Sequence, residues 1–303
     1  MKTQLMHDYG LEVIGVIKVN EHVYKLKTFN RIYYMKIVKN QSIDKIYEWI
    51  EVLHLNIFVD VLKNKQGTRA TPYQSKYYYI MEAVHNNQGM MKEVKIKFYF
   101  ETLASLHTKS FYYTKVNQDY FMKLQKDICD VIQERELYYT QMIQNYETIV
   151  YRSPSQWLLI MNYYRIYNAL CMAKQYLNQY MMMTQDYTQI RVCLTYKHFD
   201  YNHIALKEKV FLSLDHICID MPLYDIFDMY QKVPDILFDL DCLSQYYFKK
   251  IELTQEEKVL LCCLMNIVPM IYYSDDEIEN IIKLSRLLYY LDSIQSLTNQ
   301  LTC

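Results

Sequence analysis

The sequence predicts an α+β protein built from two lobes, a small β-rich N-terminal lobe with one helix and a large helical C-terminal lobe. Three observations predict it. Short runs of β-branched and aromatic residues dominate residues 1–84, and long amphipathic patterns dominate residues 85–303. Short strands and loops return at residues 191–225, as an insert within the helical lobe. The 303 residues are enough for two lobes around a cleft, where a ligand would bind.

The N-terminal lobe is expected to contain five strands and one helix. The strands are short apolar runs bounded by turn residues, at 11–19, 22–29, 32–38, 57–62 and 77–84. Residues 42–55 show helical spacing, with Ser42 as the expected N-cap. The apolar face of this helix consists of Ile43, Ile46, Ile50 and Leu53. The polar residues 63–76 carry a glycine and a proline, which predicts a hairpin loop.

The C-terminal lobe is expected to be mainly long helices. Amphipathic patterns cover residues 90–111, 117–147 and 153–183, and the last of these opens with a Ser-Pro start signal. The insert reads as short strands and loops, and from Leu223 onward the pattern is helical again. No internal repeat and no low-complexity tail is present.

Composition excludes several classes of partner. The net charge of −1 leaves no basic surface for nucleic acid or for an anionic membrane. The N-terminus has no continuous apolar stretch typical of a secretory signal, and the eight cysteines form no C-x-x-C pair, so we expect synthesis in the cytoplasm and a reduced compartment. The 33 tyrosines fit two interpretations, codon bias or a role of surface tyrosines in packing or oxidative cross-linking.

Six segments follow one another in an informative order. They are "YYMKIV" with Lys36, the helix with Glu48 and Glu51, "YYIMEAV", "LASLHTKSF", "HFDYNHI" and "LSLDHICIDMPLYDI". Together they resemble the aminoglycoside phosphotransferases, which have a two-lobed protein-kinase-like fold. The fourth segment is similar to the L-A-x-L-H-x-x-S pattern of these enzymes. Each motif is weak alone, and the resemblance rests on their order and spacing over most of the chain.

The resemblance implies a nucleotide site and its residues. Lys36 would contact the phosphates of ATP, and Glu48 or Glu51 would pair with that lysine. Met81 and Ala83 would contact the nucleotide at the hinge. Asp215, with His203 as a second candidate, would bind the metal ion. The implied cofactors are therefore ATP and Mg²⁺, although the same resemblance is compatible with no cofactor at all.

A closer resemblance is to the spore coat kinase-like proteins of endospore-forming Firmicutes, the CotS and YutH group. The segment "YYFKKIELTQEEKVLLCCLMNIVPMIYY" is similar to the C-terminal pattern of that group, a tyrosine, an L-[ST]-x-x-E helix start and a helix that ends in a proline. This resemblance implies a location in the spore coat and other coat proteins as partners. It leaves the oligomeric state open.

The loop "LTYKHFDYNHIAL" decides between activity and its loss. Active relatives read H-x-D-x-x-x-x-N, where Asp acts on the substrate hydroxyl and Asn binds a metal. An ungapped overlay places Tyr196 at the His, His198 at the Asp and His203 at the Asn. A gapped overlay uses "HFD" instead, with Asp200 as the base, but it requires a deletion inside the tightest loop of the fold. We favour the ungapped overlay.

This overlay predicts a pseudokinase that acts as an interaction module. Mg²⁺ prefers oxygen ligands, so His203 would weaken one metal site, while Asp215 would still bind one ion. The turn "VNEH" has no glycine to let backbone amides approach phosphate. Asp225 is expected to brace the loop.

Several alternatives to a pseudokinase remain open. The first is an active small-molecule phosphotransferase that uses Asp200 and Asp215. In a second, His198 itself is the general base. A third is a transition-metal site of His198, Asp200 and His203. The last is an α-rich protein with an unrelated ligand.

Overall fold

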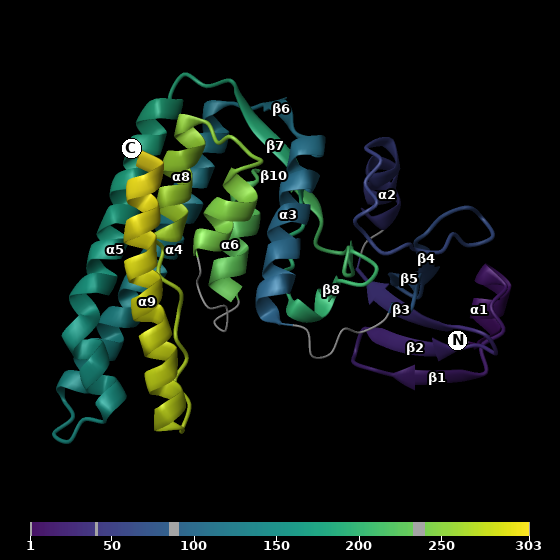
Figure 1. Ribbon diagram of the computed structural model, residues 1–303, viewed down its shortest axis with the longest axis horizontal. Helices are drawn as coiled ribbons and strands as arrows, with labels where there is room; N and C mark the ends of the chain where they lie inside the picture. Colours follow the sequence, from purple (N-terminus) through teal and green to yellow (C-terminus); the bar gives the residue numbers. More distant parts are fainter. Residues whose placement is uncertain (1, 40–41, 85–90, 233–239, 303) are drawn as a thin grey trace. The chain divides into compact units, whose positions relative to one another are not determined.

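The computed structural model describes residues 2–39, 42–84, 91–232 and 240–302 (Figure 1). Contacts between residues divide the chain into two compact units. Met1–Ser110 and Asp200–Cys218 form the first, which we call the sheet unit. Phe111–Phe199 and Ile219–Cys303 form the second, the helical unit. The predicted α+β class, with a small antiparallel sheet and a larger helical part, is confirmed.

The sheet unit contains a five-stranded antiparallel sheet in the order β1-β2-β3-β5-β4. The strands are β1 (Gly15–Lys18), β2 (Val23–Lys27), β3 (Ile32–Val38), β4 (Thr71–Tyr73) and β5 (Lys76–Glu82). The predicted strands near 11–19, 22–29, 32–38 and 77–84 are confirmed. The helix predicted from Ser42 is α2 (Ser42–Val52), and the expected capping by Ser42 falls on a side chain outside the described part.

Two predictions for this sheet were wrong. Residues 57–62 form no strand, because their backbone makes only isolated bridges, Phe58 with Phe211 and Val61 with Met81. Phe58, Val59 and Val61 are buried, and the backbone of the run is hydrogen-bonded in two places, to Phe211 far along the chain and, through Leu62 N, to Ile80 O of β5. Conversely, β4 lies inside the stretch 63–76 that was predicted to be loop alone. It pairs with β5 despite Pro72, since an edge strand tolerates a missing N–H.

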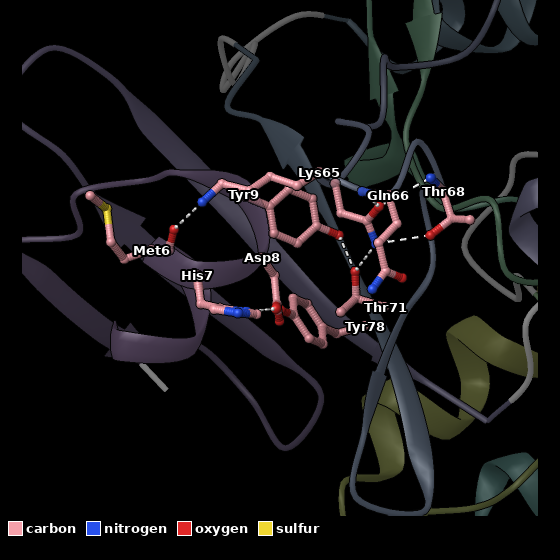
Figure 2. Close-up of polar contacts among 10 residues, drawn as sticks. Met6, His7, Asp8, Tyr9, Lys65, Gln66, Thr68, Thr71 and Tyr78 are labelled. Carbon is pink, nitrogen blue, oxygen red and sulfur yellow. Dashed lines mark hydrogen bonds and ion pairs between the residues drawn. The ribbon is translucent and has the colours of Figure 1, made fainter.

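A second correction concerns the helix α1 (Lys2–Tyr9), which was not predicted. Its apolar periodicity is weak, and Leu5 alone of its residues is fully buried. Leu5 packs into a core cluster with Leu26, Met35 and Ile80. Polar contacts add to this anchor (Figure 2): Tyr78 donates from its hydroxyl to Asp8 Oδ2 at 2.9 Å, and Tyr9 Oη lies 2.9 Å from Thr71 Oγ1. Tertiary contacts therefore form this helix where sequence periodicity could not.

Helix α3 (Lys92–Ser110) and the segment 200–218 group with the sheet, a division different from the one predicted at residue 84. Strand β5 ends at Glu82 and α3 begins at Lys92. The aromatic contacts of Phe211 explain the grouping, because its ring lies 5.8 Å from that of Phe98 and 5.5 Å from that of Tyr99, both on α3. Phe211 belongs to the hairpin of β8 (Ile204–Ala205) and β9 (Val210–Phe211).

The helical unit is dominated by long helices (Figure 1). The long helices are α4 (Gln118–Glu147), α5 (Pro154–Thr184) and α9 (Glu277–Thr302). Shorter ones are α6 (Leu223–Lys232), α7 (Leu240–Cys242), a π-helix (Leu243–Phe248) and α8 (Gln255–Met265). The predicted start of α5 is confirmed, since Ser153 and Gln156 form a capping box with Pro154 in the first turn. Helix α5 packs against α4, α8 and α9.

A three-stranded sheet in the order β10-β7-β6 completes the described secondary structure. It consists of β6 (Tyr112–Lys115), β7 (Gln189–Thr195) and β10 (Cys218–Asp220). Strand β7 runs directly into the loop that sequence analysis singled out. Within the described residues, no helix is both long enough and apolar enough to span a membrane.

Candidate nucleotide site

Lys36 and Asp215 lie together in the sheet unit. Lys36 Nζ is 2.5 Å from Asp215 Oδ1 and 2.6 Å from Ser213 Oγ. Ser213 also donates to Asp215 Oδ1 at 3.1 Å. The two charged side chains are 16% and 19% exposed, so their attraction is only partly screened by water. Sequence analysis predicted both charged residues but missed Ser213, whose only signal was its place two residues before Asp215.

The backbone on both sides explains why these residues meet. Lys36 lies in the middle of β3, with Tyr79 of β5 as its cross-strand partner, so both side chains point to the same face of the sheet. Phe211 N donates to Ile57 O at 2.8 Å, and Val59 N donates to Phe211 O at 2.9 Å. These bonds hold β9 against the backbone of residues 57–59. Asp215 follows four residues later.

The pKa of Asp215 lies below its ordinary value. Burial raises this pKa, but the hydrogen bond and the positive charge of Lys36 lower it further than burial raises it. A lowered pKa in the folded state means that the carboxylate stabilises the fold above its unfolded pKa. This stabilisation is lost as the pH falls through the folded pKa.

We therefore expect the melting temperature of Asp215→Asn to depend less on pH in the acid range than that of the parent. Between about pH 5 and pH 3, the melting temperature of the parent should fall more steeply than that of the variant, because the parent must protonate a carboxylate that Lys36 holds ionised. Asp186→Asn, at an exposed carboxylate of the helical unit, is the control. Parallel acid limbs in the parent and in Asp215→Asn would show that the pair does not stabilise the fold.

The helix carboxylates do not pair with Lys36 as the sequence suggested. Glu51 Oε1 lies 2.6 Å from Arg69 Nη2 and 3.7 Å from Lys63 Nζ, and Glu48 is exposed on α2. The reason lies in the tertiary structure. The Lys36 ammonium is paired with the Asp215 carboxylate, while the Arg69 guanidinium is paired with Glu51 of α2. Whether Glu48 or Glu51 contacts a nucleotide stays a prediction.

The two predicted hinge residues lie at the end of β5, Met81 within the strand and Ala83 just after its last residue, Glu82. Met81 is the cross-strand partner of Tyr34, two residues from Lys36, so the three side chains share one face of the sheet. The Ala83 N–H donates to Ile32 O at 2.9 Å. This donor is therefore engaged within the sheet, and contacts of Met81 and Ala83 with a nucleotide stay predictions.

The turn between β1 and β2 closes on itself. Asn20 Oδ1 accepts from His22 N at 2.9 Å and from Val23 N at 2.8 Å. Val19 N and Asn20 N both donate to Val23 O. Since these amides already have partners, the turn offers few donors to a phosphate. The turn was expected to bind phosphate poorly because it lacks a glycine. The engaged amides are a second physical reason for the same expectation.

In the helical unit, Asp225 braces the start of the loop, as predicted. Its carboxylate accepts from the backbone N–H of Tyr196 at 2.8 Å and of Lys197 at 2.5 Å, and it is 1% exposed. Lys197 has φ +47°, a left-handed conformation that costs a non-glycine residue about 1 kcal/mol or more. The charge-assisted bonds to Asp225 compensate for this cost.

Asp200 has a structural contact of its own. Its Oδ1 accepts from Asn202 N at 2.7 Å and caps the short 3₁₀-helix Tyr201–His203. His203 is partly buried, and its backbone carbonyl accepts from Leu212 N at 2.9 Å. His198 lies in the irregular stretch before Asp200 and is partly buried. The catalytic roles predicted for His198 and Asp200, and the metal role of His203, remain predictions.

A three-ligand transition-metal site does not form. Over the described ranges, no group of three or more His, Cys, Asp or Glu side chains is arranged to hold a metal ion. Sequence analysis also missed Lys95 on α3, which is 7% exposed and donates to Tyr201 O at 2.8 Å. Lysine at an α3 position gave no local signal of this contact, because its partner lies 106 residues away.

Comparisons with known proteins address the fold. No family model and no curated protein matches the sequence. An aminoglycoside phosphotransferase from Alicyclobacillus acidocaldarius of known structure is 11% identical, with a TM-score of 0.72 over 100% of this chain and 96% of that one. The chain has the aminoglycoside phosphotransferase fold.

Two further structures share this aminoglycoside phosphotransferase fold. A spectinomycin phosphotransferase solved with ADP and spectinomycin gives a TM-score of 0.59 at 10% identity, over 97% of each chain. A microcompartment-associated aminopropanol kinase gives 0.55 at 12% identity, over 96% of this chain and 97% of that one. At such identities the likeness establishes the fold alone, so function must be argued from the site.

The residues present fit a metal–nucleotide within this fold. The Lys36 ammonium suits a phosphate oxygen, while the Asp215 carboxylate and the Ser213 hydroxyl are the oxygen donors that Mg²⁺ prefers. When bound, Mg²⁺ would neutralise phosphate charge. Lys36 and Asp215 would hold such a ligand.

Proposed function

We propose that this protein is a kinase-like nucleotide-binding module whose phosphoryl transfer has been lost. The observation that carries the proposal is the pair of Lys36 and Asp215, which retains the groups for a metal–nucleotide. The loop that should supply the general base lacks the residues that catalysis would need. Its single carboxylate, that of Asp200, already caps a 3₁₀-helix through one oxygen. In the ungapped overlay, His198 and His203 occupy the positions of the catalytic Asp and the metal-binding Asn.

Magnitudes support binding without turnover. A general base contributes roughly 10²–10⁴-fold to rate, and loss of one metal ligand adds to that deficit. Binding depends on other groups, because an ammonium and a carboxylate can hold phosphate and metal without the base. The closed turn at Val19–Val23 removes backbone donors, so we expect the affinity to be weak.

The biological setting that we propose is the spore coat, where the protein would act through contacts with other coat proteins. This part rests on the resemblance of the C-terminal segment "YYFKKIELTQEEKVLLCCLMNIVPMIYY" to the CotS and YutH group. It remains a prediction, as does the choice of partners.

One experiment with two measurements tests the nucleotide proposal. ATP with Mg²⁺ or Mn²⁺ should raise the melting temperature by a few degrees, as expected for a ligand at about 10–100 times its Kd. Lys36→Met and Asp215→Asn should abolish the shift, whereas Lys76→Met, at an exposed lysine of the same sheet, should keep it. ADP release should stay at the background rate.

Two outcomes would overturn the proposal. ADP release that Asp200→Ala abolishes would make the chain an active small-molecule phosphotransferase with Asp200 as its base. Absence of any shift with either metal would remove nucleotide binding from the function.

A further inference from the structure

The helical unit contains a cavity whose lining residues take no part in the candidate nucleotide site. A cavity of about 660 Å³ opens between α5 and α9, and Asn266 at the end of α8 contributes to its wall. This volume falls within the range of roughly 300–1,000 Å³ that is usual for small-molecule sites. Among the described residues that line the cavity, none belongs to the loop 196–203.

The cavity is elongated. On α5 its lining runs from Tyr164 through Asn168 and Met172 to Tyr176, steps of four residues along one face of the helix. Twelve residues of helix correspond to about 18 Å. Ala169, which is 9% exposed, contributes a small side chain to the lining between these residues. A linear ligand with several rings in a row fits this shape better than a single compact group.

The lining has no net charge. Among the described residues that line it, the side chains charged at neutral pH are Arg165 and Asp292, and these two form an ion pair. Arg165 also donates to Leu288 O at 3.0 Å, so its guanidinium is held against α9. A nucleotide or a polyamine would find no uncompensated opposite charge here, and the cost of its desolvation would not be recovered. The chemistry therefore favours a neutral ligand.

Neutral hydrogen-bonding groups are dense along the walls. Asn168, Gln295 and Asn299 each carry both donors and acceptors in one planar amide. At the floor, Asn266 is 6% exposed and donates its amide N–H to Cys262 O at 2.8 Å, which directs that amide N–H away from a ligand and leaves the amide oxygen as an acceptor. Amides placed around buried apolar residues such as Leu291 suit a ligand that carries both hydroxyl groups and C–H surfaces. The amides would bond the hydroxyls, and the apolar side chains would contact the C–H groups.

We propose that this cavity binds a neutral oligosaccharide. Adjacent sugar hydroxyls are paired donors and acceptors, which match the planar amides of Asn168 and Gln295. The rings of Tyr164 and Tyr176, one near each end of the α5 stretch, would pack against the C–H faces of sugar rings. An extended peptide would require apolar pockets for alternate side chains, and the amide-rich walls offer few.

The test uses the full chain and three neutral trisaccharides, maltotriose, cellotriose and chitotriose. Isothermal titration should give saturable binding of at least one of them, with a Kd on the order of 0.1–1 mM. Asn168→Leu and Gln295→Leu should each weaken that binding by about tenfold or more, since each leaves sugar hydroxyls without a partner. Both residues are exposed, so the melting temperature of each variant should equal that of the parent.

The control is Gln179→Leu, an equally exposed amide on α5 outside the cavity, which should bind as the parent does. Absence of saturable binding for all three sugars at about 10 mM would overturn the proposal. So would an affinity that Asn168→Leu and Gln295→Leu leave unchanged. Neither result bears on the nucleotide proposal, whose residues lie in the sheet unit.

Discussion

Replacing Glu257 by alanine should lower the free energy of unfolding by about 3–5 kcal/mol, because it leaves the largely buried charge of Arg191 without a carboxylate partner. Arg191 Nε donates to Glu257 Oε1 at 2.8 Å, and its Nη2 contacts the second carboxylate oxygen. The side chains are 15% and 8% exposed. The guanidinium also lies 4.3 Å from the centre of the Phe111 ring. Urea unfolding followed by circular dichroism measures the loss.

Glu257 has a second role that sharpens the test. As the third residue of α8 it accepts from the backbone N–H of Thr254 at 3.0 Å, which is the bond that the glutamate of a capping box makes. Glu257→Gln can keep the hydrogen bond to Thr254 N but not the charge. Its free energy of unfolding should therefore lie between that of the parent and that of Glu257→Ala. The double variant Arg191→Met with Glu257→Leu should be more stable than Glu257→Ala, since no charge is then stranded.

The matched control is the more exposed pair of Lys174 and Glu136, which are 43% and 32% exposed. Glu136→Ala should cost no more than about 1 kcal/mol, as for ion pairs near the surface. Equal losses in Glu136→Ala and Glu257→Ala would mean that burial does not set the energy of the Arg191 pair.

Truncation of Phe211 to alanine should cost about 3–5 kcal/mol in the stability of the sheet unit. Its ring is fully buried and contacts three other aromatic rings, those of Phe58, Phe98 and Tyr99. Removing the ring leaves a cavity between aromatic side chains of two different segments, and such a site cannot collapse easily. Hydrogen exchange of residues 200–218 should accelerate, which mass spectrometry can measure.

The same variant should impair the nucleotide site. Phe211 anchors β9, and Asp215 follows it closely, so looser anchoring should move the carboxylate away from Lys36 and reduce the thermal shift with Mg²⁺ and ATP. Phe29→Ala is the control, because its ring is 77% exposed and its loss should change stability by less than about 0.5 kcal/mol. Unchanged exchange of residues 200–218 in Phe211→Ala would refute the anchoring role.

Much of the fold was predictable because its signals are local. The strand Ile32–Val38 is a run of β-branched and aromatic residues. The start of α5 at Pro154 is signalled by the capping box that Ser153 forms with Gln156. Such features depend on residues a few positions apart. The helix α1 escaped prediction because its periodicity is weak and its stability comes from contacts with a sheet elsewhere in the sequence.

The candidate site was predictable in its residue types but not in its pairings. Lys36 and Asp215 were named from motif order, yet the expected carboxylate partner of Lys36 was on α2. The structure pairs Lys36 with Asp215 instead, across 179 residues of chain. No short-range pattern encodes such a contact, because hydrogen bonds of β9 with residues 57–59 bring the segments together.

The sequence by itself determined the α+β class and the change from a strand-rich first part to a helix-rich second part. These follow from composition and periodicity, whereas the placing of His198 and His203 at the carboxylate and amide positions of the loop rests on the family resemblance. Only the tertiary structure decided that Asp200 caps a helix, that Glu51 binds Arg69, and that amides of α5, α8 and α9 surround one cavity. The physical reason is that a side chain takes the partner that folding brings within reach, and burial then determines how strongly that partner holds it.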